Sequence, residues 1–334
     1  KFIIRSQISM RQTLSFIQNL LASNGIDPKN KLGQNFLIDL NTLDLVISAG
    51  NISKDDAILE IGPGTGTLTH NLVERAGFVL SVEIDSRFEQ ILLSLFSGDV
   101  PFELHMGDAL ASKNTLDPVI LEKWKSGARR HGCKRFKLVA NLPYSVATPV
   151  LINLLLTDME IERMVAMVQF ETAEKISAPP GSQTYSGLSV LSQSLADCRI
   201  VRRVPPTVFH PRPKVDSAIL EMLPNSEKRA TLCKFLSTPN EPDNGPDRFR
   251  LFLRDLFLHR RKTVRSALGK MPTGTKIPKT MLDDLLNQLG ISSQIRADQM
   301  SSHQLLELAR AWWQVKNQID PISQIQCENL VIDS

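Results

Sequence analysis

Cysteine is scarce in this chain, and its four cysteines lie too far apart for a zinc ribbon or a disulfide scaffold. Cys133, Cys198, Cys233 and Cys327 make no CxxC pair, and the six histidines show no HxxxH or HExxH spacing. We therefore predict no metal site and expect free thiols in a reducing compartment.

Long hydrophobic runs are also missing. No apolar stretch approaches the ~20 residues that cross a bilayer, which excludes an integral membrane protein. Across 334 residues, 42% hydrophobic and 22% charged residues are ordinary for a globular protein and exclude a mainly disordered or collagen-like chain. The length allows about two domains.

Positive charge is concentrated rather than abundant. The 39 lysines and arginines exceed the 35 acidic residues by only four, yet three windows carry +18, which leaves −14 on the rest of the chain. The windows are residues 123–137 with seven cations and no acid, 199–216 with five cations and one acid, and 248–270 with eight cations and one acid. They indicate either contacts with a polyanion such as nucleic acid or solvated loops and helix faces.

The first eleven residues contain three cations and no acid, and the chain opens at Lys1 although Met10 could be a native start. A remnant of an organelle-targeting peptide and an extension ahead of Met10 both fit this composition. We expect a cytoplasmic protein, or an organellar one if residues 1–11 are a targeting remnant.

The spacing of apolar residues changes along the chain. Helical spacing at 10–24 and 37–49 gives way to short apolar runs that alternate with helical stretches at 67–75, 87–96 and 148–156. The basic stretch 112–136 fits neither period and is predicted to be a partly helical insertion. Strands are expected at residues 57–61, 78–83, 102–106, 137–141, 163–170, 199–206 and 218–223.

Strands alternating with helices predict an α/β fold whose mostly parallel sheet is covered by helices on both faces. Such sheets bind ligands outside the carboxyl ends of their strands. A proline-rich linker at 237–247 precedes helices only, at 249–258, 262–268, 279–289 and 301–315. The predicted segments are an extension with a helix at 1–30, the α/β domain at 31–236, a small helical domain at 245–318 and a tail at 319–334.

A glycine-rich turn follows the first of these strands, in Glu60-Ile61-Gly62-Pro63-Gly64-Thr65-Gly66. Glycines there let a ligand approach the backbone, and the helix amino terminus supplies amide donors. A dinucleotide site, an S-adenosylmethionine site and a plain tight turn all fit such a triplet. An acid that leads the glycines, as Glu60 does, favours S-adenosylmethionine, for which no pyrophosphate must be cradled.

Acidic residues end the next two strands. Glu83 closes the strand at 78–83, where a carboxylate can accept hydrogen bonds from both ribose hydroxyls, and Asp85 is the alternative. Asp108 follows the strand at 102–106 and can accept from the adenine amino group of a bound cofactor. Either acid could instead be a helix N-cap.

The most specific segment is Asn141-Leu142-Pro143-Tyr144, again at a strand end. The exocyclic amine of a nucleobase is a poor nucleophile because its lone pair is delocalised into the ring. The Asn141 side-chain oxygen and the carbonyl of Leu142 or Pro143 could accept its two N–H bonds and aim the lone pair at a methyl group. Tyr144 would stack on the base, which must be unpaired or flipped out. A turn that ends a strand explains the proline alone.

In this order of motifs the chain resembles the ribosomal RNA adenine N6-dimethyltransferases, the KsgA-type family. The resemblance runs from Lys31 to about Gly269. Its elements are the stretches 31–37, 60–66, 82–85, 107–109, 141–144, 167–171, 180–182, 209–218 and 260–262.

The resemblance implies a class I methyltransferase fold, S-adenosylmethionine as the methyl donor, and two successive methylations of each of two adjacent adenines near the 3′ end of small-subunit ribosomal RNA. The substrate would be an assembling ribosomal subunit. It also implies that Phe209 packs on the other face of the target base, although a core aromatic that anchors its loop is the alternative, and Gln169 could help shape the site. The implied cofactor contacts are Asn35, Leu37, Gly62, Gly64, Glu83, Asp108 and Asn141.

The basic windows gain a role from this resemblance, because RNA is recognised largely through shape, phosphates and unstacked bases. We expect no metal, no membrane contact and a monomer. The long basic stretch at 112–136 and the tail after Val315 depart from the compact bacterial pattern, and the former could be an RNA contact or a disordered loop. The expected RNA contacts are Arg212, Lys214, Arg248, Arg260, Arg261, Lys262 and Arg265.

Two other functions stay open. One is the related large-subunit adenine methyltransferase of macrolide resistance, although Leu142 and the segment 209–218 fit the small-subunit branch better. The other is a non-catalytic assembly or transcription factor on the same scaffold, against which the intact Asn35, Glu83, Asp108 and 141–144 argue.

Overall fold

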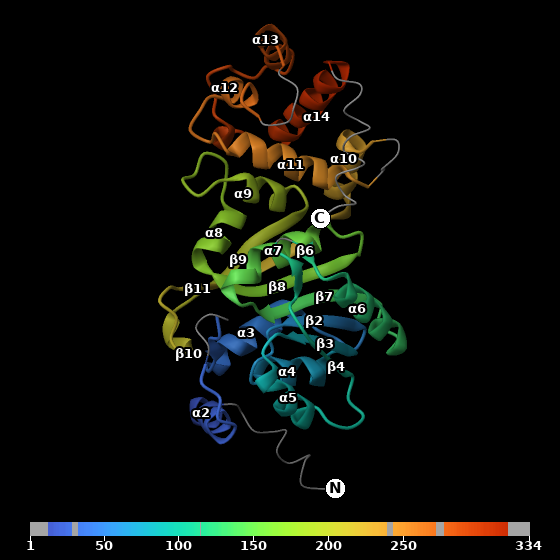
Figure 1. Ribbon diagram of the computed structural model, residues 1–334, viewed down its shortest axis with the longest axis vertical. Helices are drawn as coiled ribbons and strands as arrows, with labels where there is room; N and C mark the ends of the chain where they lie inside the picture. Colours follow the sequence, from blue (N-terminus) through green and yellow to red (C-terminus); the bar gives the residue numbers. More distant parts are fainter. Residues whose placement is uncertain (1–12, 29–32, 114, 239–242, 272–276, 320–334) are drawn as a thin grey trace. The chain divides into compact units, whose positions relative to one another are not determined.

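The computed structural model describes residues 13–28, 33–113, 115–238, 243–271 and 277–319 (Figure 1). Several positions named above lie outside the described residues: Met10 with residues 1–11, the motif residues Lys31 and Leu32, Cys327, the linker prolines Pro239 and Pro242, and the tail from residue 320. Among the described residues, none of the helices combines the length and apolar character that crossing a bilayer requires.

The chain folds into two compact units. The first takes the described residues up to Glu174 and again Asp197–Pro224, and the second takes Lys175–Ala196 and the described residues from Asn225 onward. This division differs from the predicted boundary after residue 236. The structure assigns α9 (Gly187–Gln193) and α10 (Ser226–Leu236) to the second unit.

The reason for the different boundary is where these two helices bury their apolar residues. Leu232 and Leu236 of α10 and Val190 and Leu191 of α9 are buried. Both helices pack against α11 (Gly245–Phe257) and α14 (Ser302–Ile319). Neither helix was among the predicted elements, so the sequence reading assigned their residues to the α/β domain.

A seven-stranded sheet forms the centre of the first unit, in the order β4-β3-β2-β7-β8-β11-β9. The strands β4 to β8 in this order are parallel, and β11 runs antiparallel to β8. The mostly parallel sheet is therefore confirmed, and each predicted strand forms within a few residues of its expected bounds. The strands are β2 (Asp56–Ile61), β3 (Phe78–Glu83), β4 (Phe102–Met106), β7 (Arg135–Asn141), β8 (Ile161–Gln169), β9 (Ala196–Val204) and β11 (Ser217–Pro224).

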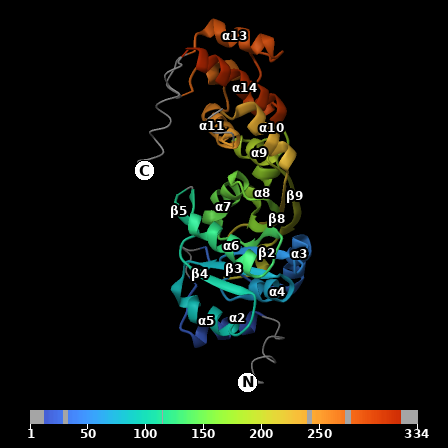
Figure 2. The ribbon, with the colours of Figure 1, turned by 90° about the vertical axis from the view of Figure 1, so that its right-hand side faces the viewer.

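Helices cover both faces of this sheet, and every residue of β2 and β3 is buried. One face, with Ile58 and Val79, packs against α3 (Leu40–Gly50) and α4 (Thr67–Arg75). The other face carries Phe78, whose ring lies against α6 (Pro118–Arg130) at Gly127. Figure 2 shows α3 and α6 on opposite sides of the strands. The remaining helices that begin in this unit are α2 (Leu14–Ser23), α5 (Glu89–Leu95), α7 (Tyr144–Leu156) and α8 (Phe170–Ser177).

The basic stretch at 112–136 is partly helical, as predicted, but its helix is a regular element of the fold rather than an insertion, and the alternative of a disordered loop is wrong for its described residues. It holds α6, which is the crossover helix between β4 and β7, after a hairpin of β5 (Leu110–Ser112) and β6 (Thr115–Leu116). Ile120 and Trp124 are fully buried, and the Trp124 indole donates to the Ala57 carbonyl at 3.2 Å. The many cations around these residues obscured the helical period.

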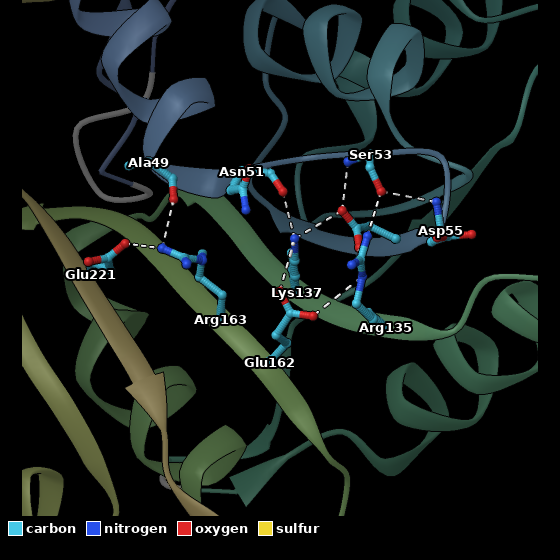
Figure 3. Close-up of polar contacts among 10 residues, drawn as sticks. Ala49, Asn51, Ser53, Asp55, Arg135, Lys137, Glu162, Arg163 and Glu221 are labelled. Atoms are coloured by element: carbon cyan, nitrogen blue, oxygen red, sulfur yellow. Dashed lines mark hydrogen bonds and ion pairs between the residues drawn. The ribbon is translucent and has the colours of Figure 1, made fainter.

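Part of the same basic window is buried at the amino ends of the strands (Figure 3). The Lys137 side chain is 0% exposed, and its ammonium donates to the Asn51 carbonyl at 2.7 Å and to the Asp56 carboxylate at 3.0 Å. A carboxylate oxygen of Glu162 lies 3.3 Å away. Arg135 binds the second Asp56 oxygen at 2.6 Å. Lys137 therefore belongs to the core of the fold, whereas the Arg135 side chain is partly exposed and pairs with the buried Asp56 from the surface.

The network continues on β8 and β11. Arg163 pairs with the buried Glu221 and donates to the Ala49 carbonyl at 3.2 Å (Figure 3). Glu221 also pairs with Arg199, from the second basic window. Each buried acid at this end of the sheet therefore meets two cations.

A two-residue ladder ties distant parts of the first unit together. β1 (Phe36–Leu37) pairs antiparallel with β10 (Phe209–His210), and the Ile38 amide donates to the Val208 carbonyl at 2.9 Å. The loop between β9 and β11, which contains Pro205, Pro206, Pro211 and Pro213, is therefore ordered.

The second unit is helical, as predicted, and it contains an isolated antiparallel bridge between Thr263 and Arg296. Its core holds Phe249 and Phe252 of α11 and Leu305 and Trp312 of α14. Its other α-helices are α9, α10, α12 (Val264–Leu268) and α13 (Lys279–Gln288).

Candidate functional site

A cavity of about 280 Å³ opens at the carboxyl ends of the parallel strands in the first unit. Its walls come from five stretches of chain: residues 33–37, 60–68, 82–84, 107–109 and 141–146. All seven residues predicted to contact the cofactor line it, and so do Leu142, Pro143 and Tyr144. The strand topology therefore brings together residues that lie more than 100 positions apart in the sequence.

The glycine turn forms one wall of this cavity. Gly62 and Gly64 have φ of 78° and 53°, in the left-handed region that other residues seldom adopt. A Cβ atom at Gly64 would lie 2.8 Å from the Phe36 ring. Glycine is therefore required in this turn for two reasons: the positive φ angles, and at Gly64 also the close contact with the Phe36 ring.

Glu60, the acid ahead of the glycines, is buried and lines the cavity. Its carboxylate accepts from the hydroxyls of Thr69 and Ser81, each at 2.7 Å. Burial raises the pKa of Glu60 from 4.5 to about 7, and the two hydroxyls offset part of that rise. The group therefore changes charge near neutral pH.

Of the two acids at the end of β3, Glu83 and Asp85, Glu83 lines the cavity. Its carboxylate accepts from the backbone amides of Gly64 at 3.1 Å and Asp85 at 2.9 Å, and burial raises its pKa. Asp85 is engaged elsewhere, because the Arg87 guanidinium and the Gln34 amide both donate to it. The Arg87 hydrogen bonds hold the pKa of Asp85 well below its usual range. Only Glu83 of this pair lines the cavity.

Asp108 lies at the exposed rim of the cavity, just after β4. One of its oxygens accepts from the Leu110 amide at 2.9 Å, a short turn that fixes the carboxylate. Among the described residues no donor reaches its second oxygen, which the predicted contact with an adenine amine would use.

Asn141 ends β7 with its side chain oriented by a distant loop. Its amide nitrogen donates to the Asn35 carbonyl at 3.0 Å. Because an amide has one oxygen and one nitrogen, this bond leaves the Asn141 oxygen as the acceptor for a ligand. The Asn35 carbonyl is a site element that the sequence reading missed, since it predicted Asn35 only as a cofactor contact.

The backbone after Asn141 distinguishes the two carbonyls proposed as the second acceptor. The Pro143 carbonyl accepts from the Val146 amide at 3.1 Å in the first turn of α7. The Leu142 amide donates to the Met167 carbonyl at 3.1 Å, and among the described residues no donor reaches the Leu142 carbonyl.

Phe209 is not brought to the cavity. Its side chain is 3% exposed and packs with Leu37, Val204 and Ile219 in the core of the first unit. This placement corresponds to the alternative of a core aromatic that anchors its loop. Gln169 ends β8 opposite Ser217 and does not line the cavity either.

The seven predicted RNA contacts fall into three groups, of which the first two are pairs. Arg212 and Lys214 are exposed in the first unit, and within the described residues no ion pair involves them. Arg248 and Arg265 are committed to other groups, since Arg248 lies 4.0 Å over the Trp313 ring and Arg265 pairs with Asp283.

A basic hollow in the second unit contains the other three predicted RNA contacts. Arg260, a wall of this hollow, pairs with Asp298 at 3.3 Å and donates to the Gln183 carbonyl at 2.6 Å. Arg296 pairs with the same Asp298 at 3.1 Å. Arg261 and Lys262 are exposed in the hollow, and the described part of the chain supplies no ion pair for them.

No cluster of three or more histidine, cysteine, aspartate or glutamate side chains able to hold a metal ion occurs among the described residues. Cys133 and Cys233 are free thiols.

The sheet order, the glycine turn and the cavity at the carboxyl edge define a Rossmann-like α/β fold of the methyltransferase class, with a helical unit following it. The chain belongs to the ribosomal RNA adenine dimethylase family, whose model matches residues 26–311. The predicted resemblance is thereby confirmed.

Similar proteins support this membership. The chain is 35% identical to the ribosomal RNA small subunit methyltransferase A of Halothermothrix orenii, over 84% of this chain and 87% of the relative. It is 36% identical to the protein of that name from Pelotomaculum thermopropionicum, over 88% and 94%.

Two solved structures share the fold. A dimethyladenosine transferase from Plasmodium falciparum has a TM-score of 0.65 at 24% identity, covering 84% of this chain and 98% of that one. The 23S ribosomal RNA methyltransferase ErmE has a TM-score of 0.58 at 24% identity, covering 83% and 99%. At 24% identity, both comparisons support the fold alone.

Proposed function

We propose that this chain transfers methyl groups from S-adenosylmethionine to the N6 amines of two adjacent adenines near the 3′ end of small-subunit ribosomal RNA. The observation that carries the proposal is the orientation of Asn141. Its nitrogen is held by the Asn35 carbonyl, which leaves the side-chain oxygen of this cavity-lining residue as a hydrogen-bond acceptor. An amine that donates to this oxygen is held where its lone pair can be aimed.

The second acceptor for the amine is the Leu142 carbonyl rather than that of Pro143. Two fixed acceptors at one strand end favour a pyramidal amine nitrogen over a planar one. The rate then depends on positioning and on acceptors already in place, without a titrating base. Tyr144 lies beside them in the cavity wall and offers its ring to an unstacked base.

The cavity residues fit S-adenosylmethionine. The Gly62–Gly64 turn permits close approach, the buried Glu83 carboxylate suits two ribose hydroxyls, and Asp108 suits an adenine amine. When bound, S-adenosylmethionine supplies a methyl group on a sulfonium: the carbon–sulfur bond breaks as the carbon–nitrogen bond forms, S-adenosylhomocysteine leaves, and the amine releases one proton. The chain's own part is to bind, orient and exclude water.

For the RNA itself, the hollow of the second unit offers Arg261 and Lys262 to phosphates, with Arg260 and Arg296 held by Asp298 in its walls. Arg212 and Lys214 offer a second pair of exposed cations in the first unit. Phe209 takes part in base stacking only if its ring is uncovered, so we assign the stacking to Tyr144.

The test is methyl transfer from labelled S-adenosylmethionine to unmethylated small ribosomal subunits, with large subunits and naked RNA as controls and the products resolved by mass. Dimethyladenosine from small subunits alone is expected. Modified adenine in large subunits would instead identify the macrolide-resistance type of enzyme.

Calorimetry with S-adenosylmethionine in the absence of RNA separates the enzyme from a non-catalytic assembly factor. Wild-type protein is expected to bind the donor, and Glu83→Gln to bind it about tenfold or more weakly, because a charged acceptor is lost. No binding by the wild-type protein would favour the assembly factor.

A further inference from the structure

The hydroxyl of Tyr144 is held by a residue outside the cavity. Tyr144 begins α7, and its phenol oxygen lies 2.7 Å from the hydroxyl oxygen of Ser217. Ser217 is 0% exposed and does not line the cavity. A ring at the start of a helix can turn about its side-chain torsions, and this bond fixes its far end.

Ser217 itself sits on a rigid support. It is the first residue of β11 and pairs with Gln169 of β8. The preceding residue, Asp216, accepts from the Phe170 amide at 3.0 Å and pairs with Arg203. The Arg203 guanidinium in turn lies 4.3 Å over the Phe170 ring.

The two methyl transfers to one nitrogen differ in the number of hydrogen bonds that can hold the amine. Before the first transfer the amine has two N–H bonds, one for the Asn141 oxygen and one for the Leu142 carbonyl. After it, the nitrogen carries one hydrogen and one methyl group, so only one acceptor can be used. The second transfer therefore depends more on the stacking that holds the base plane.

We propose that Ser217 is a positioning residue that fixes the Tyr144 ring for the second methyl transfer to each adenine. The inference rests on the proposed function. It assigns Ser217 no contact with the RNA or the methyl donor.

The first test uses the protein alone. The chain has only two tyrosines, Tyr144 and Tyr185, so labelling tyrosine with ¹³C at Cζ gives two signals, and Tyr185→Phe assigns them. Ser217→Ala is expected to shift the Tyr144 signal. Ser192→Ala is the matched control, because this buried serine hydroxyl has no hydrogen-bond partner among the described residues. An unmoved Tyr144 signal in Ser217→Ala would overturn the proposal.

The second test follows monomethyl- and dimethyladenosine over time on unmethylated small subunits. For Ser217→Ala the rate constant of the second transfer is expected to fall about fivefold and that of the first less than about twofold, so that monomethyladenosine accumulates. Tyr144→Phe, which keeps the ring, is expected to match it, and the double variant to lose no more than either single one. Ser217→Thr, which keeps the hydroxyl, is expected to restore the second transfer.

Equal slowing of both transfers, or additive losses in the double variant, would refute the positioning role. Thermal melts identify loss of folding, and Tyr144→Phe still tests the bond if Ser217→Ala does not fold. Wild-type protein that makes no dimethyladenosine would refute the proposed function, while the ¹³C signals would still decide the hydrogen bond.

Discussion

The two ends of the central sheet treat polar groups in opposite ways. At the amino ends, Lys137 and Asp56 are fully buried and each is surrounded by partners. At the carboxyl ends, the side chains of Asn141 and Asp108 are each held through one atom, and we propose that the other atom binds a ligand. Buried charges whose hydrogen bonds are all made within the protein support the fold. A binding site, in contrast, needs acceptors that still have a free position for the ligand.

We expect the largest loss of stability when one cation is removed from the buried ion-pair network at the amino ends of the strands. Lys137→Met leaves the buried Asp56 carboxylate with Arg135 as its remaining cation and the Ser53 amide as its other donor. We expect a loss of about 3–5 kcal/mol in the free energy of unfolding, measured with urea. Arg130→Ala, which breaks an exposed ion pair with Glu103, is the control and should cost less than about 1 kcal/mol. Similar losses for the two variants would contradict the comparison.

The converse change at the carboxyl end should spare stability and remove activity. Asn141→Ala deletes the acceptor, so turnover is expected to fall by about 10²–10³-fold while RNA affinity stays within a few-fold. Asn153→Ala, on α7 away from the cavity, is the control. An equal loss of RNA binding in Asn141→Ala would show that the side chain holds RNA instead.

Glu60, at the carboxyl end of β2, makes the stability of the protein depend on pH. Its pKa is about 7 in the fold against 4.5 ordinarily, so the folded state binds the extra proton and stability falls as pH rises from about 4.5 to 7. Glu60→Gln lacks this loss. Its stability relative to wild type, without the donor, is expected to improve by up to about 3 kcal/mol between pH 4 and pH 8. A pH-independent difference would mean that Glu60 titrates normally.

The smallest effect separates two basic windows of equal sequence charge. Arg261→Ala with Lys262→Ala is expected to weaken RNA binding a few-fold and to lower the slope of log affinity against log salt by about one to two. Lys123→Ala with Lys125→Ala changes side chains already paired with Glu103 and Glu122 and should change the slope less. If both double variants lower the salt slope equally, the basic window at 123–137 also contacts RNA.

Local patterns in the sequence were enough to predict the sheet, the glycine turn and the positions of Glu83, Asp108 and Asn141. These residues follow from strand periodicity, because parallel strands end at a common edge. The contacts that refine the site were not predictable in this way. The bond from Asn141 to Asn35 joins residues 106 positions apart, and no local spacing encodes it.

Charge counting failed for a related reason. Lys137 was counted with the surface cations, but it is fully buried, and its partners Asp56 and Glu162 lie on neighbouring strands and are distant in sequence. Phe209 was likewise assigned to the base by its motif, whereas its burial depends on packing with Leu37 and Ile219. Long-range pairing decides whether a charge or an aromatic ring is available, and composition does not report it.

The ladder between β1 and β10 has a consequence for how the protein is made. Phe36 leaves the ribosome more than 170 residues before Phe209, so the wall that carries Asn35 and Phe36 has no β partner during most of translation. A nascent chain released before residue 210 would contain the glycine turn, Glu83, Asp108 and Asn141, and still lack the strand that holds the wall against them. The ability to take up a ligand should therefore arise late in synthesis.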